Sequence, residues 1–363
     1  MATATMLLGS GVLLGRYMTV RSLSEHIQNN YRASTLGQLV HDREATPKVS
    51  KAYYDTKNSL SEMDSYLWVA PHVMTPFVGH GPEPGVHHNS TINPSQLRGS
   101  YPPKLPKPSG VYRIFLVGGS TAFGSGAPND NQTIGGYLEA YLNNLASTPD
   151  KNRLRFEVFT FAQPAWASTH ERIVIENRII ELMPDLVISL SGINDIHWGL
   201  GGRNILWFRS YADEHYWKVV NEVHAFLGLP RMADVTTVSS DPISCDLVAT
   251  RLRSNVALSS FALQLVDAKY LFVLQPSAHV SERDLYAKLA DPTSVREYWS
   301  GCYASIDRRL KALRRNNLYY LSLVGLFDDR DKAEIYLDAY HLGNRGNDLV
   351  ADAIRRRVVE AIL

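Results

Sequence analysis

The chain has 363 residues, of which 45% are hydrophobic and 20% are charged, an ordinary composition for a folded globular protein. Its 37 Lys and Arg residues almost balance its 36 Asp and Glu residues, and no long run of like charge occurs, which argues against a nucleic-acid partner. The length suits one α/β domain of roughly 200–250 residues with an appended segment better than two equal domains.

The first 24 residues are the part of the sequence that can indicate where in the cell the protein is located. Residues 1–15 carry no charge, and Arg16 and Arg21 precede the first acidic residue, Glu25. The uncharged stretch is shorter than the roughly 20 residues of a spanning helix, and it lacks the basic start of a secretory signal. Three interpretations stay open: a short or trimmed membrane anchor, a mitochondrial or other organelle-targeting segment, and an ordinary buried helix.

Residues 25–110 are expected to form an extended N-terminal wrap that lies on the next domain. Nine prolines fall between residues 66 and 110. Because proline removes a backbone donor and fixes φ, this density excludes long helices and central strands there.

From residue 111 onwards, strand-like and helix-like segments alternate. The predicted strands are 112–117, 156–161, 186–190, 270–274 and 318–321, and the predicted helices are 133–145, 168–182, 295–316 and 344–363. This alternation predicts βαβ units and a parallel sheet. We therefore expect residues 111–363 to form a three-layer α/β/α sandwich with a mostly parallel central sheet.

The alternation pauses at about 199–260, a stretch richer in aromatic and charged residues. We interpret it as an inserted helical cap, with helices at 211–227 and 246–261. Its aromatic residues are either a small core of the cap or a carbohydrate-stacking surface; they are Trp207, Tyr211, Tyr216 and Trp217.

The first chemical motif is Gly-Gly-Ser-Thr-Ala-Phe-Gly at 118–124, directly after a predicted strand. Glycines before a serine allow a sharp turn that exposes the hydroxyl at the carboxyl end of the sheet. The spacing matches neither a dinucleotide fingerprint nor a phosphate loop. Ser120 is therefore a candidate nucleophile, with a structural turn as the alternative.

The second motif is Asp-Ala-Tyr-His at 338–341, just before the last predicted helix. A histidine that accepts a serine proton needs a hydrogen-bond acceptor on its other ring nitrogen. Asp338 and His341 can supply both functions from one loop, although an Asp and a His at this spacing are common on protein surfaces.

The third motif is Ser-Gly-Ile-Asn-Asp at 191–195, after the third predicted strand. A side-chain amide at Asn194 can donate to a developing oxyanion. The alternative is that Asn194 and Asp195 only cap the following helix.

The three motifs in this order resemble the SGNH (GDSL-like) hydrolase family, in a bacterial branch with GGST in place of GDS. The segment His-Leu-Gly-Asn-Arg-Gly-Asn at 341–347 and Leu-Arg-Gly at 97–99 extend the resemblance. It implies a flavodoxin-like sandwich, Ser120 as nucleophile, and Asp338 and His341 as its acid and base partners. It also implies a membrane-associated or exported protein of the cell envelope.

The resemblance also implies an oxyanion hole made by Ser120, Asn194 and a residue after the second strand. The family has a glycine at this last position, whereas the chain has Ala162. An alanine N–H can still donate if its φ is negative, whereas a positive φ would strain it.

These residues predict a serine esterase that hydrolyses an O-acyl ester, on a glycan, a lipid or a small molecule. We expect His341 Nε2 within about 3.5 Å of Ser120 Oγ. The mechanism requires no metal or organic cofactor, and nothing in the sequence identifies a protein partner. The alternatives are an O-acyltransferase with the same triad and a catalytically weak SGNH domain that serves as an accessory subunit.

The remaining candidate residues give weaker evidence of a function. Cys245 and Cys302 have no spacing typical of zinc ligands, and they form either one disulfide or two free thiols. His197 and Trp198 either line the substrate cleft or pack internally. No metal site is predicted around the other histidines, which lack partners at ligand spacing.

Overall fold

The computed structural model describes residues 51–55, 70–146, 154–202, 220–232 except 222 and 226, 241–280 and 293–363. Predictions for residues 1–24 and for the aromatic residues between 203 and 219 lie outside this part of the chain.

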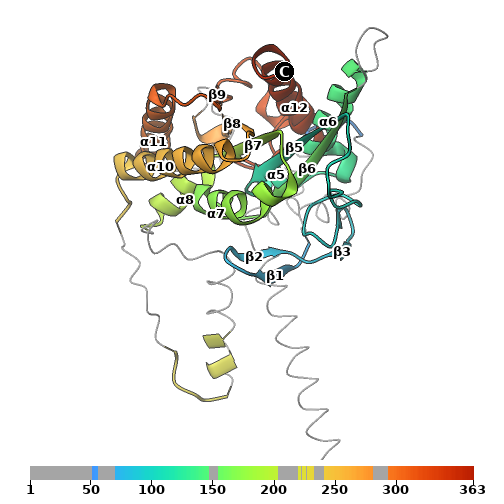
Figure 1. Cartoon of the computed structure of the whole chain (residues 1–363). Coiled ribbons are helices and arrows are strands. Elements are labelled where there is room, and N and C mark those ends of the chain that lie inside the picture. The colour runs from blue at the N-terminus through green and yellow to red at the C-terminus, as the bar shows by residue number, and fades with distance from the viewer. Residues whose placement is uncertain are drawn as a thin grey trace, which may run out of the picture.

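Five parallel strands form the central sheet (Figure 1). In spatial order they are β6 (Arg155–Ala162), β5 (Val111–Gly118), β7 (Leu186–Ser191), β8 (Lys269–Leu274) and β9 (Leu318–Ser322). The second strand of the sheet in the chain thus lies at one edge, which is the flavodoxin-like order. The predicted parallel sheet is confirmed, and the strand order reverses between β5 and β7.

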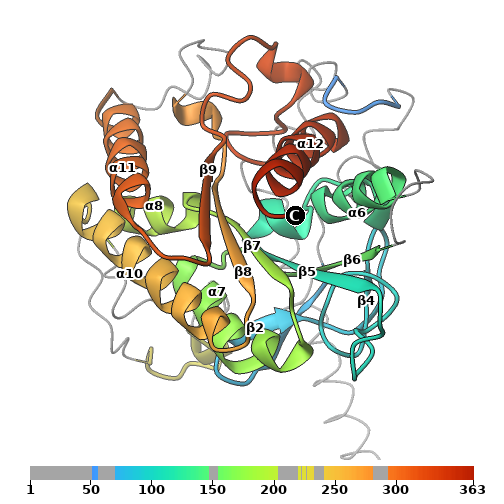
Figure 2. The same cartoon turned by 45° about the horizontal axis from the view of Figure 1, so that its top comes forward.

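Helices cover both faces of the sheet (Figure 2). One layer holds α6 (Ile134–Ala146) and α12 (Asn344–Ala361). The other layer holds α7 (Ser168–Val174), α10 (Cys245–Gln264) and α11 (Thr293–Ala312). Helix α7 continues into η2 (Ile175–Ile179) and η3 (Ile180–Leu182). Successive residues of a strand point to opposite faces. Ile114 and Leu116 of β5 therefore enter the first core, and Phe115 and Val117 enter the second. The predicted three-layer α/β/α sandwich is confirmed.

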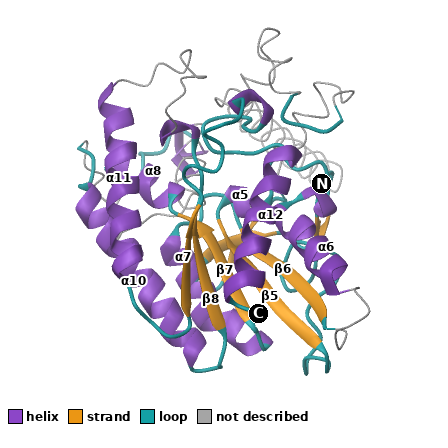
Figure 3. Ribbon diagram, turned by 90° about the horizontal axis from the view of Figure 1, so that it is seen from above, coloured by secondary structure: helices purple, strands orange, loops and turns teal. Residues whose placement is uncertain are grey.

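The short helices α5 (Ser120–Phe123) and α8 (Ile193–Leu200) follow β5 and β7. Because these strands are parallel and adjacent, both helices begin at the same end of the sheet (Figure 3). This end, at a reversal of strand order, is where open α/β sheets bind ligands.

The sequence analysis placed residues 199–260 in an inserted helical cap, and this interpretation is wrong for the part that forms α10. Val248, Leu252 and Val256 of α10 are fully buried in the core between the helices and the sheet. They recur at spacings of four, so one stripe of the helix faces the sheet. This helix therefore belongs to a layer of the sandwich.

The described part of the N-terminal segment, 51–55 and 70–110, adds one antiparallel bridge to the edge of the central sheet, between Arg98 and Thr160 of β6, and two short antiparallel pairs outside that sheet. They are β1 (His72–Thr75) with β2 (Gly79–Pro82), and β3 (Gly85–Val86) with β4 (Thr91–Ile92). The described residues also include three 3-10 turns, η1 (Asp130–Gln132), η5 (Ala278–Val280) and η6 (Lys332–Glu334).

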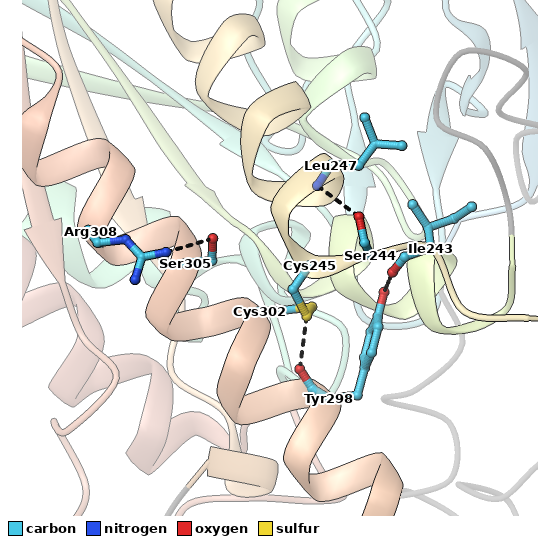
Figure 4. The surroundings of a disulfide bond; sticks show 8 residues. All are labelled: Ile243, Ser244, Cys245, Leu247, Tyr298, Cys302, Ser305 and Arg308. Atoms are coloured by element: carbon cyan, nitrogen blue, oxygen red, sulfur yellow. Dashed lines mark hydrogen bonds between the residues drawn. A yellow bond between two sulfur atoms is a disulfide. The ribbon is translucent and has the colours of Figure 1, made fainter.

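Cys245 and Cys302 form a disulfide that joins the start of α10 to α11 (Figure 4). The sequence left this pairing open. Cys302 is fully buried, and the bond ties together two helices of the same layer. Among the residues described, no helix combines the length and apolarity needed to cross a bilayer.

Candidate active site

Ser120 is the first residue of α5 and is half-buried at the carboxyl end of β5. The turn needs glycine at 119, because a Cβ there would lie 2.3 Å from Asn194 Nδ2. At Gly118 a Cβ would lie 2.4 Å from the Leu190 carbonyl oxygen. The two glycines thus let the backbone of the turn approach β7 and α8 closely, which places Ser120 beside Asn194.

Ser120, His341 and Asp338 form one hydrogen-bonded chain. His341 Nε2 lies 2.7 Å from Ser120 Oγ, within the expected distance, and His341 Nδ1 lies 2.6 Å from Asp338 Oδ2. An ionised carboxylate only accepts hydrogen bonds, so we assign the proton to Nδ1. Nε2 is then free to accept the proton of the serine hydroxyl, as a general base requires.

The carboxylate of Asp338 is held in its ionised form. Its Oδ1 accepts the backbone N–H groups of Tyr340 at 2.8 Å and of His341 at 2.7 Å. Burial alone would raise the pKa of Asp338, but the charge of His341 and these hydrogen bonds outweigh it and lower the pKa below its usual range. Asp338 therefore accepts from the imidazole as an anion.

A buried polar network, which sequence reasoning missed, fixes the loop that carries His341. Gln275 Nε2 donates to Thr121 Oγ1 at 2.7 Å, and Thr121 Oγ1 donates to the Tyr340 carbonyl oxygen at 3.2 Å. Ser277 Oγ donates to the Ala339 carbonyl oxygen at 3.1 Å. Gln275 and Ser277 directly follow β8 in the sequence. Because ligand sites of open α/β sheets lie at the carboxyl ends of the strands, this position could have identified the two residues from the sequence.

Asn194 lies in the first turn of α8. Its Nδ2 donates to the Trp166 carbonyl oxygen at 2.7 Å. A primary amide has two N–H donors, so one remains for another acceptor beside Ser120. The first N–H groups of a helix have no partner within it, and Ser120 N–H is in this position in α5. These two donors lie on adjoining segments at the mouth of the site.

The neighbouring Asp195 ties this turn to the start of α7. Asp195 accepts from Ser168 N–H at 3.0 Å and from Ser168 Oγ at 2.5 Å, and Asn255 Nδ2 donates to Ser168 Oγ at 2.9 Å. All three side chains are buried. The loop that carries Trp166 is therefore anchored at both α8 and α10.

Ala162 is the last residue of the edge strand β6, and its φ is not positive. The next N–H, that of Gln163, donates to the Gly118 carbonyl oxygen of β5. Because successive N–H groups of a strand point to opposite sides, the Ala162 N–H faces away from β5. The oxyanion role expected for Ala162 finds no support in this orientation. Ala165, further along the same loop, has a φ of 67°.

A residue of the N-terminal segment binds the end of the helix that carries Ser120. The buried Arg98 donates through Nη1 to the carbonyl oxygens of Phe123 at 2.9 Å and Gly124 at 3.1 Å, at the end of the helix that begins with Ser120. Its Nε pairs with Asp130 at 2.7 Å. A cation at a helix C-terminus satisfies carbonyls that lack partners within the helix.

Another carboxyl group, that of Glu171, is fully buried in α7. Burial, together with the nearby charge of Asp195, raises the pKa of Glu171 to about 8. Its carboxyl group lies next to Ser189 and Ser191 of β7, and sequence reasoning did not identify it.

His197 is exposed on α8, and its ring lies 5.3 Å from that of Trp198, which is buried. Within the described residues, no cluster of three or more His, Cys, Asp and Glu side chains is arranged to hold a metal ion.

No protein-family model matches the chain, and no curated protein matches it in sequence. Similar solved structures include a lipase from a goat rumen metagenome, 13% identical with a TM-score of 0.44 over 68% of this chain and 96% of the lipase. An acetylxylan esterase from Geobacillus stearothermophilus is 14% identical, with a TM-score of 0.42 over 68% of this chain and 94% of the esterase. The strand order and the two helical layers define the fold, and the contacts of Ser120 define the chemistry that the site can perform.

Proposed function

We propose that this protein is a serine ester hydrolase of the SGNH type, with Ser120 as its nucleophile. The observation that carries the proposal is the hydrogen-bonded chain from Ser120 Oγ through His341 to Asp338 at the carboxyl end of β5. A serine, an imidazole and an oriented carboxylate in this order are the elements of nucleophilic acyl transfer.

In the first half-reaction, Ser120 Oγ attacks the ester carbonyl carbon while His341 Nε2 takes its proton. Asp338 stabilises the resulting imidazolium. The oxyanion receives hydrogen bonds from Ser120 N–H and from Asn194 Nδ2, which packs against the adjacent Gly119. The intermediate collapses when His341 returns the proton to the departing alkoxide, which leaves an acyl group on Ser120.

In the second half-reaction, water attacks the acyl-serine and gives its proton to His341. Collapse of that intermediate releases the carboxylic acid and restores the Ser120 hydroxyl. No step requires a metal or an organic cofactor. A sugar hydroxyl in place of water would give the acyltransferase alternative, and product analysis with and without a glycan acceptor distinguishes the two.

We further propose that the protein acts in the cell envelope or another oxidising compartment, on O-acyl groups of glycans or lipids. The Cys245–Cys302 disulfide supports the location, because disulfides persist in oxidising compartments and are rare in the cytosol.

A fluorophosphonate probe tests the nucleophile. We expect stoichiometric labelling of the parent, loss of labelling in Ser120→Ala, and unchanged labelling in Ser125→Ala, a nearby serine outside the triad. Absence of labelling in a folded parent would remove the enzyme proposal and favour an accessory role for the domain.

A further inference from the structure

The peptide group between Trp166 and Ala167 is hydrogen-bonded at both ends. Its carbonyl oxygen accepts from Asn194 Nδ2 at 2.7 Å, and its N–H, which belongs to Ala167, donates to His170 Nδ1 at 3.1 Å. This peptide is trans, so its C=O and N–H lie in one plane and point in opposite directions. His170 and Asn194 are therefore joined through a single rigid peptide group.

His170 occupies a position at the start of α7 that suits an acceptor. Ala167 precedes the helix, and its methyl side chain makes no capping hydrogen bond. His170 is the third residue of the helix, where a glutamate or glutamine side chain commonly accepts the N–H of the capping residue. Burial, together with the nearby His80, lowers the pKa of His170 to about 3, so the ring is neutral near pH 7. We assign its proton to Nε2, because Nδ1 accepts from Ala167.

The side chains around this peptide group are buried and packed together. Trp166 is fully buried and His170 is 4% exposed. Their rings are almost parallel, with planes 5° apart and centroids 6.2 Å apart. The indole N–H of Trp166 donates to the His80 carbonyl oxygen at 3.1 Å. The acceptor nitrogen of His170 is thus held in place by packing on Trp166, and the peptide group is held by the acceptor.

The backbone before this peptide group is in a conformation that needs such support. Trp166 N–H donates to the Gln163 carbonyl oxygen at 3.1 Å, which closes a four-residue turn around Pro164 and Ala165. Ala165 has a φ of 67°, a left-handed conformation that glycine adopts at lower cost. A strained backbone of this kind persists only where surrounding contacts hold it. The hydrogen bond to His170 lies one residue beyond the turn and is one of these contacts.

We propose that His170 is a positioning residue for the oxyanion hole. It fixes the Trp166–Ala167 peptide group, and this peptide group orients the amide of Asn194 towards the oxyanion. The acceptor nitrogen of His170 provides this function, and the aromatic ring only holds that nitrogen in place. An oxyanion donor is effective when its direction is set before the charge develops, so an error in the peptide group reduces the rate. The proposal rests on the proposed esterase function.

Two variants separate the acceptor from the ring. His170→Phe keeps an aromatic ring and removes the acceptor, whereas His170→Gln removes the ring and keeps an acceptor. For an activated acetate ester, we expect His170→Phe to lower kcat about tenfold with KM within about twofold, and His170→Gln to retain kcat within about threefold. His88→Leu, at an exposed histidine, is the matched control and should leave both constants unchanged. A loss in His170→Gln equal to or larger than that in His170→Phe would overturn the proposal.

A double-mutant cycle with Asn194→Ala distinguishes positioning from a general loss of structure. If His170 acts through Asn194, His170→Phe should lower kcat less than about twofold once residue 194 is alanine. A structural defect would instead lower kcat by the same factor in both backgrounds, and that result would overturn the proposal. If His170→Phe does not fold, His170→Leu, which is smaller and also lacks an acceptor, takes its place in every measurement.

Hydrogen exchange of the Asn194 side-chain amide tests the same contact without turnover. In protein labelled with ¹⁵N at the asparagine side chains, the Asn194 signals are those that Asn194→Ala removes. Their exchange with solvent should be at least about tenfold faster in His170→Phe than in the parent, and within about threefold of the parent in His170→Gln. Equal exchange in the parent and His170→Phe would overturn the proposal. If the parent neither hydrolyses esters nor labels at Ser120, the esterase proposal fails, while this measurement still decides whether His170 orients Asn194.

Discussion

Asn194 donates its side-chain amide to the carbonyl oxygen of Trp166 at 2.7 Å, although 28 residues separate them in sequence. The contact joins the start of α8 to the loop after β6. It also uses one amide hydrogen and orients the other, so the donor is positioned before substrate binds. Such preorganisation is what makes an oxyanion donor effective.

Asn194→Ala should lower kcat about 10²–10³-fold with little change in KM, because the lost hydrogen bond forms mainly in the transition state. Steady-state hydrolysis of an activated acetate ester measures this. Asn177→Ala, at an exposed asparagine bonded within its own helix, is the control. A kcat within about threefold of the parent would exclude Asn194 from the oxyanion hole.

Asp338→Asn should lower kcat roughly 10⁴-fold, because an amide no longer fixes the tautomer that leaves Nε2 free. Single-turnover acylation with an activated ester measures the loss directly. The exposed Asp329→Asn is the matched control. Retention of a tenth or more of the parent rate would contradict the assigned role.

The same substitution should also change how stability depends on pH. The folded pKa of Asp338 is lowered, while an unfolded aspartate titrates near about 3.9. The unfolded chain therefore binds its proton first as pH falls, and the stabilisation by Asp338 is present above about pH 4 and is lost below it. Urea unfolding should show the difference between parent and Asp338→Asn shrinking as pH falls from about 5 towards 3. A constant difference across this range would contradict the lowered pKa.

Glu171→Gln should flatten the loss of stability that accompanies a rise in pH from about 4.3 to 8. The folded pKa of Glu171 is about 8, above the unfolded value of about 4.3. The unfolded chain releases this proton first, so the parent loses stability as pH rises from about 4.3 to 8, by up to about 1.4 kcal/mol per pH unit. Urea unfolding of the parent, Glu171→Gln and the exposed control Glu181→Gln between pH 5 and 9 measures this. Equal slopes in all three would show that Glu171 is ionised in the folded protein.

Removal of the disulfide should lower the free energy of unfolding. The bond closes a loop of 57 residues, for which chain entropy gives about 4 kcal/mol. The double variant Cys245→Ser/Cys302→Ser should unfold at lower urea concentration, and dithiothreitol should shift the parent to the same midpoint without affecting the variant. An unchanged parent under reducing conditions that do break the bond would contradict this contribution.

The sequence by itself determined the strands, most helices and the three motifs with Ser120, Asn194 and Asp338–His341. These are local signals: apolar runs of strand length, helical spacing, and glycines that permit one turn. The order of the motifs resembles that of a known hydrolase family, and this resemblance predicted that His341 Nε2 would lie within hydrogen-bond reach of Ser120 Oγ, as it does.

Only the tertiary structure decided which surfaces and side chains of separate segments contact one another. The stripe of α10 packs on the sheet rather than in a cap, the Ala162 N–H turns away from β5, and Cys245 pairs with Cys302. Likewise, Arg98, Gln275 and Ser277 support the site through contacts between residues far apart in the chain. No local pattern encodes these relationships, because each depends on which face of an element meets a partner that is brought close only by folding.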